Sequence, residues 1–374
     1  MRDLKLNAPF WALVHAIAVL ATSIAACAPE QETQDRPSGA GTNNGDHNGA
    51  NNGDGGECRT YSRGSTWTYD DEGRPLSRTF DADGVTSHVE ACTYDEQGNL
   101  VRDARDENAD GTFERYFVFA YDDEGRVTME GRDEDANGSV DMSLNYTYDD
   151  EGRLVSVQED PFDDDTGGWT LTNTYDEAGN LTVTAMDGDG DGLADHVCTL
   201  TYDPGGHLTT EACAQDSVDT FTHWTWDGDN PILMLRGAVG YDTDFQRTAW
   251  TWDEAGNMTS EEYGYGRRDA VTMRTTWTWS ETGNKLTEVI DHLDGAWEDE
   301  RTVWTYDDSG RLVSSVSTTG QSWAWTWDEA GDMVLLEEDH DGDGEMDEVW
   351  RWTWDDMGNK LTETVTSKTD GCYE

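Results

Sequence analysis

The sequence predicts an all-β fold made of tandem β-hairpins, and three observations support this prediction. A short motif recurs twelve times: Thr, then Tyr or Trp, Asp, two variable residues, Gly, Arg or Asn, and an apolar residue, as in Thr147–Leu154. Its aromatic anchors recur about every 27 residues, and no stretch has the apolar periodicity of a helix. The 17 Trp, 14 Tyr and 8 Phe indicate a folded chain, because disordered chains are poor in aromatic residues.

Each repeat unit is expected to form one hairpin around its aromatic anchor. Asp-x-x-Gly between two β-rich runs predicts a turn, because Asp bonds to the backbone ahead of it and Gly accepts positive φ. Aromatic residues at alternate positions before the turn, such as Trp250 and Trp252, share one face of the sheet. We expect the anchor rings to be largely buried in a stacked structural ladder. A platform of exposed Trp for carbohydrate is the alternative. The anchors are Tyr69, Tyr94, Tyr121, Tyr148, Tyr175, Tyr202, Trp226, Trp252, Trp279, Tyr306, Trp327 and Trp354.

One unit lacks the glycine of the motif. After Trp226 the sequence reads Asp-Gly-Asp-Asn-Pro, without the Gly four residues beyond the anchor. Because proline lacks an N–H group, we expect Pro231 to interrupt strand pairing there.

The motif resembles the YD repeat of the Rhs family, which also occurs in teneurins and in shell subunits of bacterial toxin complexes. The resemblance covers roughly residues 61–369. It implies a long hairpin array that forms a coiled sheet ribbon or a partial spiral. A six-bladed, propeller-like arrangement of the twelve units is the alternative. The chain ends at Glu374 without the core-associated segment and toxic domain of Rhs toxins, so the resemblance does not imply toxin activity.

The N-terminal residues predict export and lipid anchoring. Residues 1–26 have a charged start and an apolar run of the length typical of a signal peptide. The sequence at 24–27, Ile-Ala-Ala-Cys, resembles a bacterial lipobox, which implies acylation of Cys27. The following Ala28 implies, by the same resemblance, the outer membrane or cell surface, with the membrane as a partner through the lipid. Residues 27–57 are rich in Gly, Asn and Asp and predict a flexible tether, and residues 58–374 form the array.

The charge of the chain bears on its partners. The 80 acidic residues outnumber the 24 Lys and Arg, giving a formal net charge of −56. Such a field repels phosphate backbones, which excludes nucleic acid as a partner, and attracts divalent cations and basic partners.

Four connections between hairpins predict calcium-binding loops. Oxygen-bearing side chains recur at positions 1, 3, 5 and 9 around a Gly at position 6, and Ca²⁺ takes six to eight oxygen ligands. EF-hands are excluded, because position 12 holds Cys198, Trp350, Phe117 or Leu144 instead of Glu. An acidic hairpin turn without metal is the alternative. The candidate ligands are Asp187, Asp189, Asp191, Asp195, Asp339, Asp341, Asp343, Asp347, Asp106, Asn108, Asp110, Glu114, Asp133, Asp135, Asn137 and Asp141.

Cysteine and histidine residues are further candidates for sites. In an oxidising compartment we favour the disulfides Cys198–Cys213 and Cys58–Cys92, with Cys372 free. No nucleophile elbow or phosphate loop occurs, and we interpret His196, beside an acidic loop, as a solvated surface residue.

The sequence therefore predicts a non-catalytic, lipid-anchored and calcium-stabilised surface protein that acts in adhesion or as a scaffold. Its ligand would be a surface protein or a glycan. The alternatives are a carbohydrate-binding or carbohydrate-active protein, and a shell-type component without a toxin domain.

Overall fold

The computed structural model describes residues 60–160, 168–215, 219–238, 245–266, 271–293, 295 and 299–368. Every regular element in these ranges is a β-strand, which confirms the all-β fold. Across the same ranges, no helix has the length and apolarity needed to cross a membrane. The chain divides into two compact units: Met1–Tyr116 with Trp350–Glu374, and Phe117–Val349.

Each aromatic anchor lies at the end of the first strand of a hairpin, or one residue before it in the Trp226 unit. The two strands of each hairpin are antiparallel. The strands are β1 Thr60–Tyr69, β2 Pro75–Ala82, β3 Val85–Tyr94, β4 Leu100–Asp106, β5 Arg115–Tyr121, β6 Val127–Asp133, β7 Met142–Tyr148, β8 Leu154–Asp160, β9 Thr170–Tyr175, β10 Leu181–Asp187, β11 His196–Tyr202, β12 Leu208–Gln215, β13 Thr220–Asp227, β14 Asn230–Ala238, β15 Phe245–Trp252, β16 Met258–Gly266, β17 Met273–Trp279, β18 Lys285–His292, β19 Glu300–Tyr306, β20 Leu312–Ser317, β21 Ser322–Trp327, β22 Met333–Asp339, β23 Glu348–Trp354 and β24 Lys360–Lys368.

The motif forms the turn of each hairpin by local hydrogen bonds, as the unit at Asp253 illustrates. The Asp253 Oδ1 atom accepts the N–H groups of Ala255 and Asn257, both at 2.9 Å, and Oδ2 accepts the Asn257 side-chain amide at 3.0 Å. These bonds, the Asn257 side chain first, lower the pKa of Asp253. Gly256 has φ +85°, a conformation that glycine adopts without steric cost. The residues that recur in the motif are therefore the ones that form the turn.

In several units an arginine takes the place of Asn and also reaches the next hairpin. Arg153 donates from Nε to Asp149 Oδ2 at 2.7 Å, and its guanidinium lies 4.8 Å from the ring centroid of Tyr175, the next anchor. One side chain thus closes its own turn and stacks on its neighbour's anchor.

The polar tip of the anchor binds the preceding hairpin. The Tyr202 hydroxyl donates to the Leu181 carbonyl at 2.8 Å, and the Trp279 indole N–H donates to the Met258 carbonyl at 2.7 Å. The acceptor in both cases begins the second strand of the previous unit. Trp252, Trp279 and Trp354 are each covered over most of their surface, which confirms the expectation of largely buried rings.

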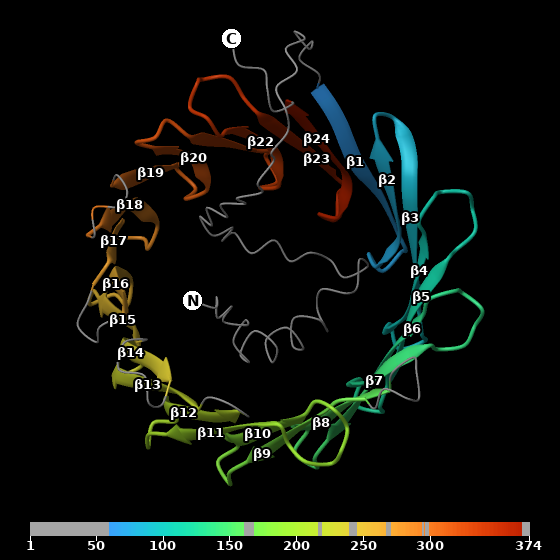
Figure 1. The fold of residues 1–374 in the computed structure, drawn as a ribbon. Helices are drawn as coiled ribbons and strands as arrows, with labels where there is room; N and C mark the ends of the chain where they lie inside the picture. Colours follow the sequence, from blue (N-terminus) through green and yellow to red (C-terminus); the bar gives the residue numbers. More distant parts are fainter. Residues whose placement is uncertain are drawn as a thin grey trace, which may run out of the picture. The chain divides into compact units, whose positions relative to one another are not determined.

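The first and last strands of the array pair with each other inside the first unit (Figure 1). Strands β1 and β24 are antiparallel over seven residue pairs, from Thr60 opposite Lys368 to Thr66 opposite Thr362. The Tyr69 hydroxyl donates to the Lys360 carbonyl at 2.6 Å, the same bond that joins successive hairpins elsewhere. We call this pairing the seam. The expected open ribbon or partial spiral is therefore wrong in one respect, since the two ends of the array meet.

The propeller alternative is also wrong. Within the second unit, the pairing runs without interruption from β6 to β22, whereas separate blades would break it after every fourth strand. Pro231 does not interrupt pairing either. It lies opposite Trp226 at the start of β14, where the lost N–H is tolerated, as it is for Pro75 at the start of β2.

Candidate calcium-binding loops

The four acidic loops connect one hairpin to the next. They lie between β4 and β5, β6 and β7, β10 and β11, and β22 and β23. The first candidate ligand is the last residue of a strand in every case, and the ninth directly precedes the next strand. The strands therefore hold both ends of each loop.

The side chains at positions 1 and 9 close the loop, as the one at Asp187 illustrates. The Gly192 N–H donates to Asp187 Oδ2 at 2.8 Å, and the Gly188 N–H donates to Asp195 Oδ2 at 2.7 Å. Each carboxylate thereby satisfies a backbone N–H group of the loop that has no partner in the strand ladder.

The side chains at positions 3 and 5 hold the middle of the loop. The Asp191 N–H donates to Asp189 Oδ1 at 3.1 Å, and the Leu193 N–H donates to Asp191 Oδ1 at 2.8 Å. Both are the short-range bonds by which Asp and Asn stabilise turns.

All four loops share this arrangement. The N–H group of position 6 donates to the side chain at position 1, and that of position 2 donates to the side chain at position 9. The N–H group of position 5 donates to the side chain at position 3, and that of position 7 donates to the side chain at position 5. The equivalent donors are Gly111, Glu107, Asp110 and Thr112; Gly138, Glu134, Asn137 and Ser139; and Gly344, His340, Asp343 and Glu345. The bonds alone explain why each of these positions carries a side-chain oxygen.

Carboxylate oxygens gather in at least three of these loops. In each, one oxygen from each of three acids lies within 4.8 Å of the others. Asp191 is outside the group of its own loop. The acid at position 1 is the most enclosed side chain of the loop. In the loops at 106, 133 and 339 this acid is only 2–3% exposed. The groups are Asp106, Asp110 and Glu114; Asp133, Asp135 and Asp141; and Asp187, Asp189 and Asp195.

The donor set fits calcium in chemistry. Three like charges so close together repel one another, and a dication would reverse that repulsion. Carboxylate oxygens with backbone carbonyls and water are the ligands that Ca²⁺ prefers. The same side chains also suffice as turn formers, so both interpretations agree with the geometry.

The backbone of the loops differs at position 4. Gly190 and Gly342 have φ +72° and +76°, whereas Ala109 and Ala136 adopt φ +57° and +54°. An L-residue with a Cβ atom pays a steric cost of about 1 kcal/mol in this region. The loops at 106 and 133 are therefore strained at a position where the other two are not.

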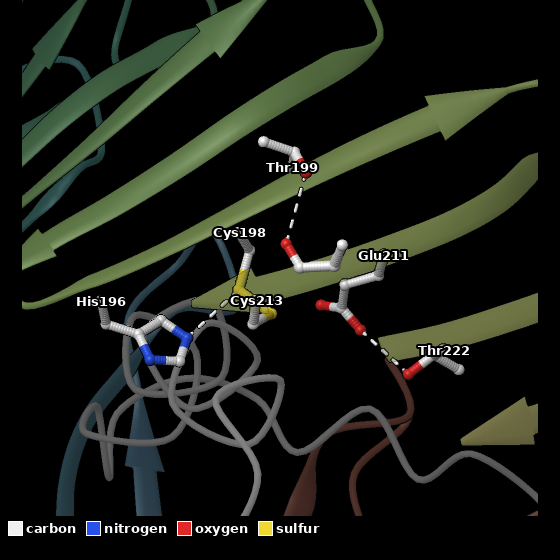
Figure 2. Close-up of a disulfide and its surroundings, with 7 residues drawn as sticks. His196, Cys198, Thr199, Glu211, Cys213 and Thr222 are labelled. Carbon is white, nitrogen blue, oxygen red and sulfur yellow. Dashed lines mark hydrogen bonds between the residues drawn. A yellow bond between two sulfur atoms is a disulfide. The ribbon is translucent and has the colours of Figure 1, made fainter. Parts of the chain in front are cut away.

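The structure contains the Cys198–Cys213 disulfide, one of the two pairs expected from the sequence. Cys92 is disulfide-bonded too, while Cys27, Cys58 and Cys372 lie outside the described residues. Our interpretation of His196 as a solvated surface residue was wrong. It is half-buried, with Nε2 3.1 Å from Cys198 Sγ (Figure 2). The sequence did contain a signal for this contact: His196 precedes Cys198 by two residues on a strand, so the two side chains lie on the same face.

A hollow between two successive turns offers no catalytic pair. It has a volume of about 570 Å³, with Asp176 and Asp203 in its lining. The side chains of Asn180 and His207 bond to these carboxylates, as do backbone N–H groups of each turn, and these bonds lower the pKa of both. Neither is therefore adapted to take up a proton near neutral pH.

Comparison with known proteins supports the repeat assignment. Residues 306–346 match the family model described as RHS Repeat. The matched segment begins at the anchor Tyr306, contains the anchor Trp327 and ends in the loop that follows, so it has the architecture of the other units. The resemblance to Rhs-type repeats is thereby confirmed. None of the curated proteins is similar enough in sequence to match this chain.

Two solved structures resemble the chain. The crystal structure of TcdB2-TccC3-Cdc42 is 13% identical over 79% of this chain and 18% of its own, with a TM-score of 0.40. The Photorhabdus luminescens Tc holotoxin pore is 16% identical over 77% of this chain and 15% of its own, with a TM-score of 0.46. This chain thus spans less than a fifth of those chains.

Proposed function

We propose that this chain, built of RHS repeats, is a non-catalytic structural component of the shell type. The single observation that carries the proposal is the seam between β1 and β24. An unpaired strand edge is a template for adding a partner's strand, which is one way in which sheets bind peptides and other chains. In this array, the first strand offers its outer edge to the last strand of the same chain instead.

The aromatic residues also favour a scaffold over a carbohydrate platform. The indole N–H of Trp252 donates to the Pro231 carbonyl at 2.8 Å, and that of Trp277 donates to Glu288 Oε2 at 2.6 Å. These donors are engaged within the fold, so they are not available to orient a sugar.

A disulfide across the seam tests the proposal. Ser62 and Thr366 are directly opposed, so the variant Ser62→Cys with Thr366→Cys should form an intramolecular disulfide under mild oxidation. Non-reducing electrophoresis and peptide mapping would detect it. The matched control is Ser62→Cys with Ser367→Cys, because a shift of one residue puts the second side chain on the other face of the sheet.

The outcome separates the shell-type component from a ribbon that associates end to end. A cross-linked monomer in the first variant, and none in the control, is the expected result. Cross-linked dimers without a cross-linked monomer would show that β1 pairs with another copy, and the proposal would fail.

We further propose that Cys27 is acylated and anchors the chain in the outer membrane. The lipobox-like sequence before it supports this, and two or more acyl chains are needed for stable anchoring. Cys27→Ser should release the protein from membranes into the soluble fraction. Intact mass spectrometry that finds an unmodified mature N-terminus at another residue would contradict lipidation.

Calcium binding is the second candidate function, supported by the three groups of carboxylates. Metal that binds only the folded state adds about 2.7 kcal/mol of stability at a hundredfold excess over its dissociation constant. A chelator should therefore lower the melting temperature, and Asp110→Ala, Asp135→Ala and Asp189→Ala together should remove most of that shift, because each of these acids belongs to one of the three groups. Sodium at matched ionic strength is the control for screening. If sodium reproduces the calcium effect and calorimetry finds no saturable site, the loops are turns alone.

A further inference from the structure

A histidine and two cysteines converge on one face of the hairpin formed by β11 and β12 (Figure 2). Cys198 and Cys213 are directly opposed in the strand register, and His196 precedes Cys198 by two residues. His196 Nε2 lies 3.1 Å from Cys198 Sγ. Strand geometry alone accounts for the convergence, because alternate residues face the same side of a sheet.

The three side chains form a compact set of ligand atoms. The imidazole nitrogen and both sulfur atoms lie within 4.8 Å of one another. Cys198 is 0% exposed and Cys213 is 8% exposed, whereas His196 is half-buried. Solvent therefore reaches this set from the imidazole side, and the sulfur atoms are shielded.

We propose that this cluster binds a zinc-like divalent metal ion when its disulfide is reduced. Two thiolates and one imidazole are ligands that Zn²⁺ prefers, and water would occupy the fourth tetrahedral position. The oxidised hairpin is held by the disulfide and the reduced hairpin by the metal, so the two strands remain joined in both states.

The chemistry balances with a dithiol as reductant. The dithiol transfers two electrons and two protons to the Cys198–Cys213 bond, giving two thiols, and is itself oxidised to a disulfide. The metal ion then displaces the two thiol protons. At a Zn–S distance of about 2.3 Å, the sulfur atoms must separate to roughly 3.8 Å. The two cysteines are directly opposed on paired strands, so their side chains can make this movement.

The experiment uses the full chain, reduced with a phosphine, and Co²⁺ as a spectroscopic probe. One equivalent of Co²⁺ should give a thiolate-to-cobalt charge-transfer band that Zn²⁺ abolishes. Cys198→Ser with Cys213→Ser should lose the band, which also controls for the other cysteines. His196→Ala should weaken Co²⁺ binding about tenfold or more. The matched control is His223→Ala on β13, because His223 bonds weakly to Thr210 and not to the sulfurs.

A second measurement covers the case in which a variant folds poorly. In the reduced wild-type chain, Zn²⁺ should slow alkylation of Cys198 and Cys213, as measured by peptide mass spectrometry. The proposal is overturned if no charge-transfer band appears, if His196→Ala binds Co²⁺ as tightly as the His223→Ala control, or if Zn²⁺ leaves the alkylation rates unchanged.

Discussion

Removing one hydroxyl group from the seam tests whether the two ends of the array are joined by the same hydrogen bond that joins successive hairpins within the array. Tyr69→Phe deletes the bond from the Tyr69 hydroxyl to the Lys360 carbonyl, which is 2.6 Å long and part-buried. The net contribution of such a bond is about 1 kcal/mol. Tyr202→Phe deletes the equivalent bond to Leu181, which is 2.8 Å long, and serves as the matched control.

Native-state hydrogen exchange of the full chain measures the effect where it occurs. A loss of about 1 kcal/mol corresponds to a roughly fivefold fall in protection. Tyr69→Phe should produce this fall in peptides from β1 and β24, and Tyr202→Phe should produce it in β10 and β11 while leaving the seam unchanged. If Tyr69→Phe leaves β1 and β24 protected as in the wild type while the control shows its loss, the seam is not closed by the repeat's own bond, and our reasoning is refuted.

Three further predictions follow from local chemistry. Ala109→Gly with Ala136→Gly should raise the free energy of unfolding by about 0.5–1 kcal/mol per site, as measured by urea unfolding, because both alanines adopt positive φ; a loss of stability would contradict the strain. Burial raises the pKa of Tyr94 to about 12, so the stability that the neutral phenol provides is complete below pH 10 and is lost as the pH rises towards 12. Phenolate absorbance and circular dichroism, measured together, would follow this loss. A phenolate titration near pH 10 in the folded state would contradict the prediction. Arg153→Lys should lower the melting temperature more than the exposed control Arg351→Lys, because lysine replaces neither the Nε bond to Asp149 nor the planar stack on Tyr175; equal melting temperatures would contradict it.

The hairpins could be predicted from the sequence because their chemistry is local. Asp253, Gly256 and Asn257 close a turn within five residues, and the alternation of Trp250 and Trp252 fixes the face they share. The sequence also located the acidic loops, since each acid bonds to a backbone group at most seven residues away.

The seam and the ligand groups could not be predicted in the same way. Tyr69 and Lys360 are 291 residues apart, and the acceptor is a backbone carbonyl, which leaves no mark in the sequence. The spacing of the acids also did not reveal that Asp191 stands apart from Asp187, Asp189 and Asp195. Such groupings depend on side-chain direction within the loop, whereas the pattern records only position.

The antiparallel register of the seam has a mechanical consequence. Because Thr60 lies opposite Lys368, the two ends of the described array leave the seam at the same side. Tension that pulls these two residues apart loads the pair at that side first and then each following pair in turn. The seven pairs would therefore open one after another, as in a zipper, at a lower force than if all seven were sheared together. A protein held at one end and loaded at the other would yield at this joint before its hairpins did.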